Sequence, residues 1–110
     1  MATYNKFNQF VADLCTKVHN LDSDALKIML TNTAPVASNT VKANLTEVAA
    51  GNGYTAGGTQ AVFSSGAQTS GTFKLILSAV TFTASGGSIG PFEFAVLYNA
   101  TAASGNLIAW

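Results

Sequence analysis

The stretch FEFAVLYNATAASGNLIAW (residues 92–110) decides the fold. In its first part, large apolar side chains occupy every second position: Phe92, Phe94, Val96 and Tyr98. Alternation with a period of two is typical of a β-strand that buries one face. The segment ATAASGN (100–106) has the composition of a turn, and LIAW (107–110) predicts a last short strand. This end of the chain is therefore predicted to be two strands joined by a turn.

Strand patterns also occur in three earlier segments. Residues 26–31, 59–65 and 72–83 are predicted as strands, and ASGGSIG (84–90) as a turn. Within 72–83 the apolar parity changes at Val80, which predicts a bulge or a strand that passes between sheets. Short strands separated by turns rich in Gly, Ser and Asn predict a mainly β chain that forms an antiparallel β-sandwich, Ig-like or jelly-roll-like.

The N-terminal segment has a different period. Residues 4–20 are predicted to form an amphipathic helix whose apolar side chains follow one stripe: Phe7, Phe10, Val11, Leu14, Val18 and Leu21. We expect this stripe to be buried against a sheet or a neighbouring subunit. Residues 41–50 fit both a helical turn and a strand, and we favour a short helical turn. The predicted organisation is one domain, 1–110, with the helix in 1–21 and the β-sandwich in 22–110.

The charge content narrows the class of partner. Charged residues make up only 9% of the chain, all five cations are lysine, and the formal net charge is zero. Scattered lysines do not make the basic patch that nucleic acid requires, and the same balance disfavours membrane surfaces. No apolar run is long enough to span a bilayer, and the first ten residues lack the layout of a signal peptide. A near-neutral surface resists self-association poorly, so it suits a protein whose faces pack against neighbours.

The segment GNGYTAGG (51–58) raises the question of a phosphate-binding loop. A dinucleotide-binding motif would need its third glycine one residue before Gly57, and a P-loop would need Lys and Ser or Thr after Gly58. We therefore expect a shaped structural loop, formed by Gly51, Gly53, Tyr54, Gly57 and Gly58. Positive φ is expected at Gly53 or Gly57, and Tyr54 is expected to anchor the loop by its ring and its hydroxyl group.

The other motifs lack the context for catalysis. Gly86–Gly90 matches G-x-S-x-G around Ser88, but a strand pattern follows it and the only histidine, His19, precedes it. Cys15 and His19 are four residues apart on the predicted helix, but a metal site needs further ligands. We expect Cys15 to be a buried, inert thiol. The acidic residues are dispersed, and nothing points to a glycosidase pair. No catalytic residue, cofactor or metal is therefore expected.

Three segments together resemble a known family. They are YNKFNQFVADLCTKVHNLDSDALKIMLTNTAPV (4–36), LTEVAAGNGYTAGG (45–58) and FTASGGSIGPFEFAVLYNATAASGNLIAW (82–110). This combination resembles a family of small virion structural proteins of tailed bacteriophages, of the capsid decoration or cement type. The resemblance covers nearly the whole chain, and AAGNGYTAGG and IGPFEFAVLYN are its most specific parts.

The resemblance implies a non-enzymatic building block of the virus particle, made in the host bacterial cytoplasm and placed on the capsid surface. Such a protein would form a homo-oligomer and bind the major capsid protein or other virion proteins, with no nucleic-acid or membrane partner. A position in the tail, neck or fibre is the alternative. Family members continue past LIAW with another turn and strand. We therefore expect a short member, or a sheet that another chain completes.

Two competing functions are a fibre-borne module that binds carbohydrate and a hydrolase that uses Ser88. Stacking rings for a sugar could come from Tyr4, Tyr54, Tyr98 and Trp110.

The apolar C-terminal strand carries a separate prediction. Its alternate side chains point to opposite faces, and a short strand near a sheet edge is a template for pairing with another chain. We therefore expect Leu107, Ile108 and Trp110 to be ordered and to lie at or near an intersubunit contact.

Overall fold

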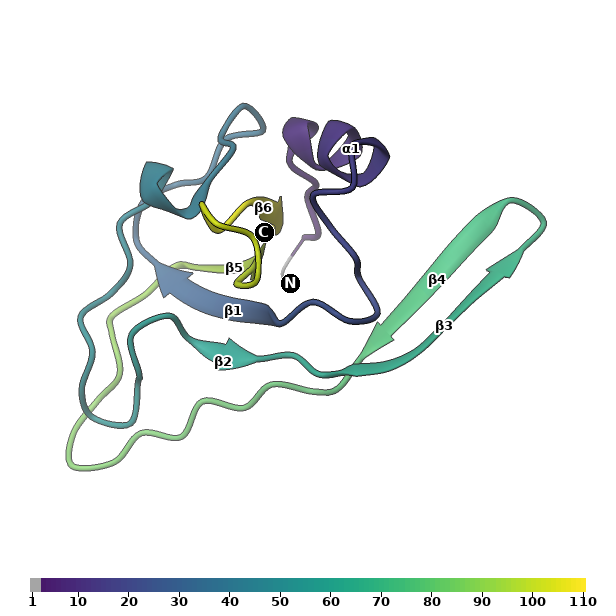
Figure 1. The fold of residues 1–110 in the computed structure, drawn as a ribbon. Coiled ribbons are helices and arrows are strands. Elements are labelled where there is room, and N and C mark those ends of the chain that lie inside the picture. Colours follow the sequence, from purple (N-terminus) through teal and green to yellow (C-terminus); the bar gives the residue numbers. More distant parts are fainter. Residues whose placement is uncertain (1–2) are drawn as a thin grey trace.

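Residues 3–110 are described by a computed structural model (Figure 1). The elements in chain order are α1 (Asn8–Cys15), β1 (Leu26–Thr31), the 3₁₀ turn η1 (Lys42–Asn44), β2 (Thr59–Gln60), β3 (Phe63–Thr69), β4 (Thr72–Leu77), β5 (Phe94–Asn99) and β6 (Leu107–Ala109). The strands form a four-stranded sheet in the order β2-β1-β5-β6 and a two-stranded sheet of β3 and β4. All strand pairs are antiparallel, so the mainly β, antiparallel class is confirmed.

The four-stranded sheet forms the body of the molecule. β1 and β5 pair along their full length, from Leu26 opposite Asn99 to Thr31 opposite Phe94. β5 continues through the turn into β6, so the predicted strand, turn and strand at the C-terminal end are present. The outer edge of β6 is not free, because the backbones of Asn5 and Trp110 exchange hydrogen bonds of 2.8 and 2.9 Å.

The two faces of the body sheet differ in how completely they are covered. One face carries a closed apolar cluster of six buried side chains: Phe7, Met29, Leu45, Val96, Tyr98 and Leu107. Successive side chains of a strand point to opposite faces. On the second face Leu26, Leu30 and Ile108 are buried, whereas the apolar side chains packed around Leu26 and Ile108 are only partly buried: Phe10, Leu21, Leu75, Leu77 and Leu97. This second face is therefore incompletely covered.

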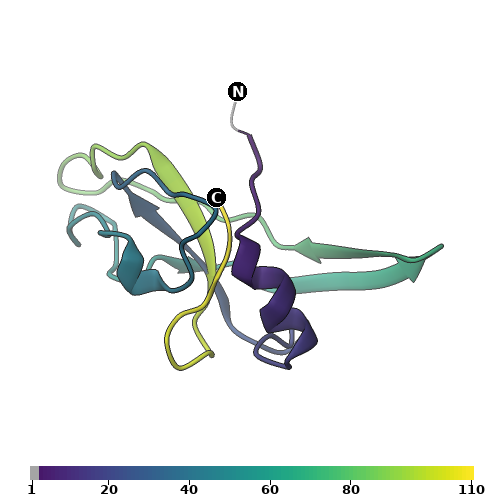
Figure 2. The same cartoon turned by 90° about the horizontal axis from the view of Figure 1, so that it is seen from above.

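β3 and β4 form a hairpin, residues 63–77, that we call the arm. It extends away from the body in both views (Figures 1 and 2). Within residues 3–110, no backbone hydrogen bond joins the arm to another element. The radius of gyration is 14.1 Å, whereas a compact chain of this length has about 13 Å. The arm and the body sheet do not stack along their whole length, so the sandwich type stays a prediction.

The helix is shorter than predicted, and the predicted stripe is covered only in part: Phe7 is buried and Phe10 is partly buried. It ends at Cys15 because Lys17 adopts a φ of 65° and the Val18 amide donates to the Asp13 carbonyl over 2.9 Å. This is a helix-ending geometry usually formed by glycine, which the sequence does not signal. Asp13 is the buried residue of α1, whereas Val11 and Leu14 of the predicted stripe are 47% and 41% exposed. Those two residues are therefore not buried within the chain itself, and their burial against a neighbouring subunit stays a prediction.

The strand boundaries also differ from prediction. The segment predicted as one strand at 59–65 is divided between β2 and β3. The strand predicted at 72–83 ends at Leu77, so the parity change at Val80 marks chain that has left the sheet. The irregularity in register lies in β3, between Phe63 and Ser65. At 41–50, the helical alternative is confirmed by η1.

Candidate functional site

The glycine-rich loop is held by hydrogen bonds within the chain. Tyr54 is buried, and its hydroxyl donates to Glu47 Oε1 over 2.5 Å and accepts from the Leu30 amide over 3.1 Å. The Gly57 amide donates to the same Glu47 oxygen over 2.6 Å. Burial raises the pKa of Tyr54, and the hydrogen bond to Glu47 adds to this. Because a carboxylate of this chain already occupies the Gly57 amide, the loop serves as a structural anchor.

A second tyrosine closes the same network. The Tyr98 hydroxyl donates to the Gly57 carbonyl over 2.6 Å. Lys42 Nζ lies 5.3 Å from the centre of the Tyr98 ring and 3.3 Å from Glu47 Oε2. Burial raises the pKa of Tyr98. Tyr54 and Tyr98 are both buried, so neither ring is available to stack on a sugar.

A buried polar cluster connects α1 to the C-terminal strands. Asn99 Nδ2 donates to Asp24 Oδ2 over 2.6 Å and lies 2.9 Å from His19 Nδ1. Asn106 Nδ2 donates to Asp13 Oδ2 over 3.0 Å, which explains why Asp13 faces inward. His19 Nε2 lies 3.8 Å from Asp13 Oδ2 and has no hydrogen-bond partner among residues 3–110. Burial lowers the pKa of His19 and outweighs the opposing effect of the two aspartates.

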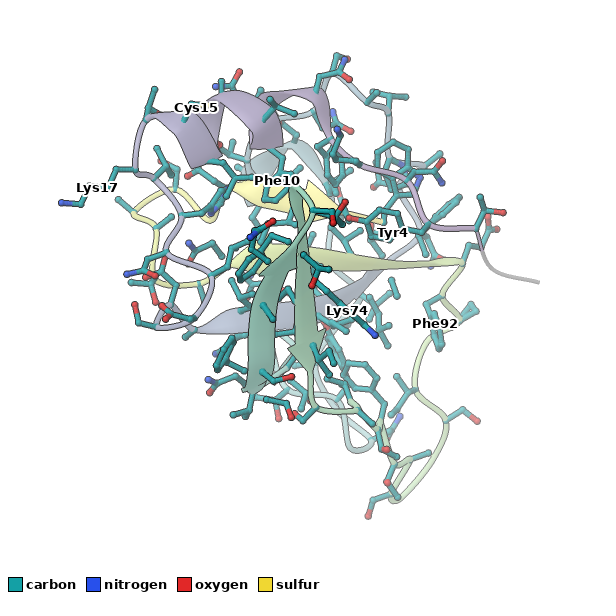
Figure 3. All side chains as sticks on the ribbon, turned by 90° about the vertical axis from the view of Figure 1, so that its right-hand side faces the viewer. Tyr4, Phe10, Cys15, Lys17, Lys74 and Phe92 are labelled. Atoms are coloured by element: carbon teal, nitrogen blue, oxygen red, sulfur yellow. The ribbon has the colours of Figure 1, made fainter. Side chains whose placement is uncertain are left out.

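The candidate catalytic and metal-binding residues are not brought together. Cys15 is exposed, so the prediction of a buried thiol is wrong: α1 ends at this residue (Figure 3). Within residues 3–110, no group of three His, Cys, Asp or Glu side chains could hold a metal ion. Ser88 is exposed, the described chain beyond it forms no helix, and its carbonyl accepts from Asn52 Nδ2. The context of a nucleophile elbow is therefore missing around Ser88.

The C-terminal residues are ordered and largely buried within their own chain. Leu107 and Ile108 are 0% and 4% exposed. Trp110 is partly buried, with its ring centre 4.5 Å from that of Phe7. Of the three residues expected at an intersubunit contact, only Trp110 retains surface for a partner, and the contact itself stays a prediction.

The most distinctive surface is an apolar groove on the incompletely covered face of the body sheet. Its volume is about 550 Å³, and it is lined by Tyr4, Phe10, Leu14, Leu21, Leu26, Phe73, Leu75, Leu77, Leu97 and Ile108. Among the residues that the structure describes, no charged side chain contributes to this lining. The arm overhangs the side of the body on which Tyr4 and Phe10 lie, whereas Lys17 points away from it (Figure 3). The groove is thus bordered by α1, the arm and the sheet.

The arm presents its most apolar face to the groove. The register places Gln68 opposite Phe73 and Phe63 opposite Leu77, so these side chains share a face. Phe73 is 56% exposed and Phe63 is 36% exposed. A Cβ atom on Gly66 would lie 2.7 Å from the Phe73 ring and 3.3 Å from the Phe63 ring. Glycine at this position therefore leaves room for two neighbouring aromatic rings.

Sequence reasoning missed this surface, although a signal was present. Residues 59–79 contain one charged side chain, Lys74, which lies on the opposite face of the arm from Phe73. An exposed strand normally carries charges that prevent edge-to-edge pairing. The lack of charge in this segment indicates a hairpin that another surface covers.

Comparisons of the chain with protein-family models, with curated proteins and with solved structures find no match. None of the helices within residues 3–110 is long and apolar enough to cross a membrane.

Proposed function

We propose that this chain is a non-enzymatic structural protein of a bacteriophage particle, and specifically a head decoration protein that binds the outside of the capsid. The observation that carries the proposal is the exposed apolar arm beside an apolar groove, in a chain of zero net charge. Contiguous apolar surface of this kind marks a site of protein contact. The resemblance to small virion proteins supplies the biological setting, with the major capsid protein or another virion protein as the partner.

We propose further that the β-sandwich predicted from the strand pattern is completed between chains. The arm lacks a second layer over most of its length, and the second face of the body sheet is only partly covered. Packing of another chain on these two surfaces would give the two-layered arrangement of a sandwich.

Quantitative mass spectrometry of purified particles tests the virion assignment. Heads and tails separated after disruption would be measured independently, with the major capsid protein as the internal standard. We expect this chain in the head fraction at a fixed ratio to the capsid protein. Its presence only in the tail fraction would favour the tail, neck or fibre position, and its absence from both would refute the proposal.

A second candidate function is a carbohydrate-binding module on a fibre. Tyr4 is 71% exposed, and it lines with Trp110 a hollow of about 230 Å³. An adjoining hollow of about 310 Å³ includes Trp110, Glu93 and Asn5, which could accept and donate hydrogen bonds to hydroxyl groups. Aromatic rings beside such polar groups are a suitable chemistry for a sugar.

Glycan binding by the purified protein distinguishes this second function. Binding that is lost in Trp110→Ala and kept in Phe92→Ala would favour it, since Phe92 is exposed but lines neither hollow. Absence of glycan binding together with presence in the head fraction would leave the decoration role.

A further inference from the structure

We infer that the arm of this chain docks onto a second copy of the same chain, so that two arms pack against each other around a twofold axis. The inference deepens the proposed structural role and names the partner of the apolar groove. In this arrangement the face that carries Phe63 and Phe73 meets the same face of the second arm. The opposite face of the arm, which carries Ile76, meets Leu14 on α1 of the second copy.

The distribution of exposed side chains motivates this pairing. Phe73 and Phe63 are exposed on one arm face, Ile76 is 41% exposed on the other, and Leu14 is exposed across the groove. A segment that enters the groove must therefore offer apolar side chains on both of its sides. The arm does so with Phe63 and Phe73 on one face and with Ile76 on the other, where Lys74 is the one charged side chain.

The lack of charge on this surface favours a second copy of the chain over a strongly charged partner. The groove lining carries no charge, and the arm carries only Lys74. A basic or acidic partner would gain no ion pair from this surface. Two copies do not repel each other, because the formal net charge of each is zero. A twofold contact also needs a self-complementary patch, and a flat apolar face is complementary to itself.

The area is sufficient for a stable pair. Each arm face is about 20 Å long and roughly 10 Å wide at ordinary strand dimensions, which gives about 200 Å² per face. Two arm faces and the covered wall of the groove give roughly 600 Å² per copy, and about 1,200 Å² for the pair reaches the lower end of stable interfaces. The free backbone edges of the arm would also be shielded from pairing with other strands.

Sedimentation equilibrium of the purified full chain tests the inference. We expect wild type to dimerise, and Phe73→Asp to raise the dissociation constant by roughly 30-fold or more, because a buried aromatic side chain at the centre of an interface is a typical hot spot. The matched control is Phe92→Asp, since Phe92 is 47% exposed but lies outside the groove and the arm. It should leave the dissociation constant unchanged. A monomeric wild type, or a dimer that Phe92→Asp disrupts and Phe73→Asp does not, would overturn the inference.

Disulfide trapping tests which faces meet. In a Cys15→Ser background, Leu75→Cys places a thiol near the middle of the inner arm face, and Lys74→Cys places one on the opposite face. We expect an interchain disulfide from Leu75→Cys and none from Lys74→Cys. The reverse result, or no disulfide from Leu75→Cys in a protein that still dimerises, contradicts the packing of arm on arm. Both measurements use purified protein, so their outcome is independent of whether particles contain the chain.

Discussion

Gly53 shows how a single residue fixes the position of the glycine-rich loop. Its φ of 99° suits glycine, and the same holds for Gly57 at 91°. A Cβ atom on Gly53 would also lie 2.1 Å from the Thr83 carbonyl oxygen, in the long segment between β4 and β5. The positive φ was predictable from the glycine pattern. The contact with Thr83 was not, because it joins segments that are thirty residues apart and follows no local pattern.

Gly53→Ala is therefore predicted to destabilise the fold more than strain alone explains. We expect a loss of about 2 kcal/mol or more in the free energy of unfolding, because both backbone strain and a backbone clash are introduced. Gly71→Ala is the matched control, since Gly71 has a φ of 83° with open space around it, and it should cost about 1 kcal/mol. Equal losses in urea denaturation would show that the contact with Thr83 contributes nothing.

Tyr54→Phe is predicted to weaken the anchor of the same loop. The substitution removes the hydroxyl group that joins the Leu30 amide to Glu47 and leaves a buried amide unsatisfied. The expected loss in unfolding free energy is about 1–3 kcal/mol. Tyr4→Phe should change it by less than about 0.5 kcal/mol, because Tyr4 is 71% exposed. The interpretation fails if the two variants unfold at the same denaturant concentration.

The lowered pKa of His19 predicts that the folded protein loses stability at mildly acidic pH. Its pKa is lowered in the folded protein, so folding favours the neutral imidazole. Stability is complete above the unfolded value of 6.5 and is lost as the pH falls from there through the lowered folded value. His19→Gln should flatten this part of the stability profile. Because the chain has one histidine, an NMR titration assigns the pKa directly; a value above 6.5 would contradict this account.

At the scale of elements, the strands of the body and the position of β4 were predictable, but the extension of the arm away from the body was not. The segment FEFAVLYN alternates clearly, and β5 lies where that pattern predicts a strand. The helix stripe is covered by this chain only in part, because Asp13, paired with Asn106, faces inward while Leu14 faces the groove. A sequence pattern predicts which side of a helix is apolar, but it does not show whether the chain itself supplies the surface that covers it.

The base and the tip of the arm are predicted to contribute differently to the stability of the monomer. Leu77 packs against the cluster around Leu26 and Ile108, whereas Phe73 is mostly exposed. Measured at concentrations where the protein is monomeric, Leu77→Ala should cost about 1–2 kcal/mol in unfolding free energy. Phe73→Ala should cost less than about 0.5 kcal/mol. A larger loss from Phe73→Ala would mean that the tip packs on its own body.

At the scale of the whole molecule, the chain is elongated and exposes apolar surface that its own core does not cover. The principal extents are 47 × 30 × 28 Å, and the arm accounts for the elongation (Figures 1 and 2). One closed cluster stabilises the body, while the second face of the sheet is left partly open. Low charge content and strand pattern predicted a β protein suited to packing against neighbours. They could not predict where the open surface lies, because that depends on how far the arm extends from the sheet.

The central claim is that this chain is a structural component of a phage head, and its copy number on purified heads tests that claim most directly. Mass spectrometry against the major capsid protein should give a fixed ratio in wild-type heads. Heads assembled with Phe73→Asp should carry much less of the chain, because this substitution disrupts the arm-on-arm contact through which two copies are proposed to pair, and heads with Phe92→Asp should match wild type. Heads that lack the wild-type chain altogether would contradict the account.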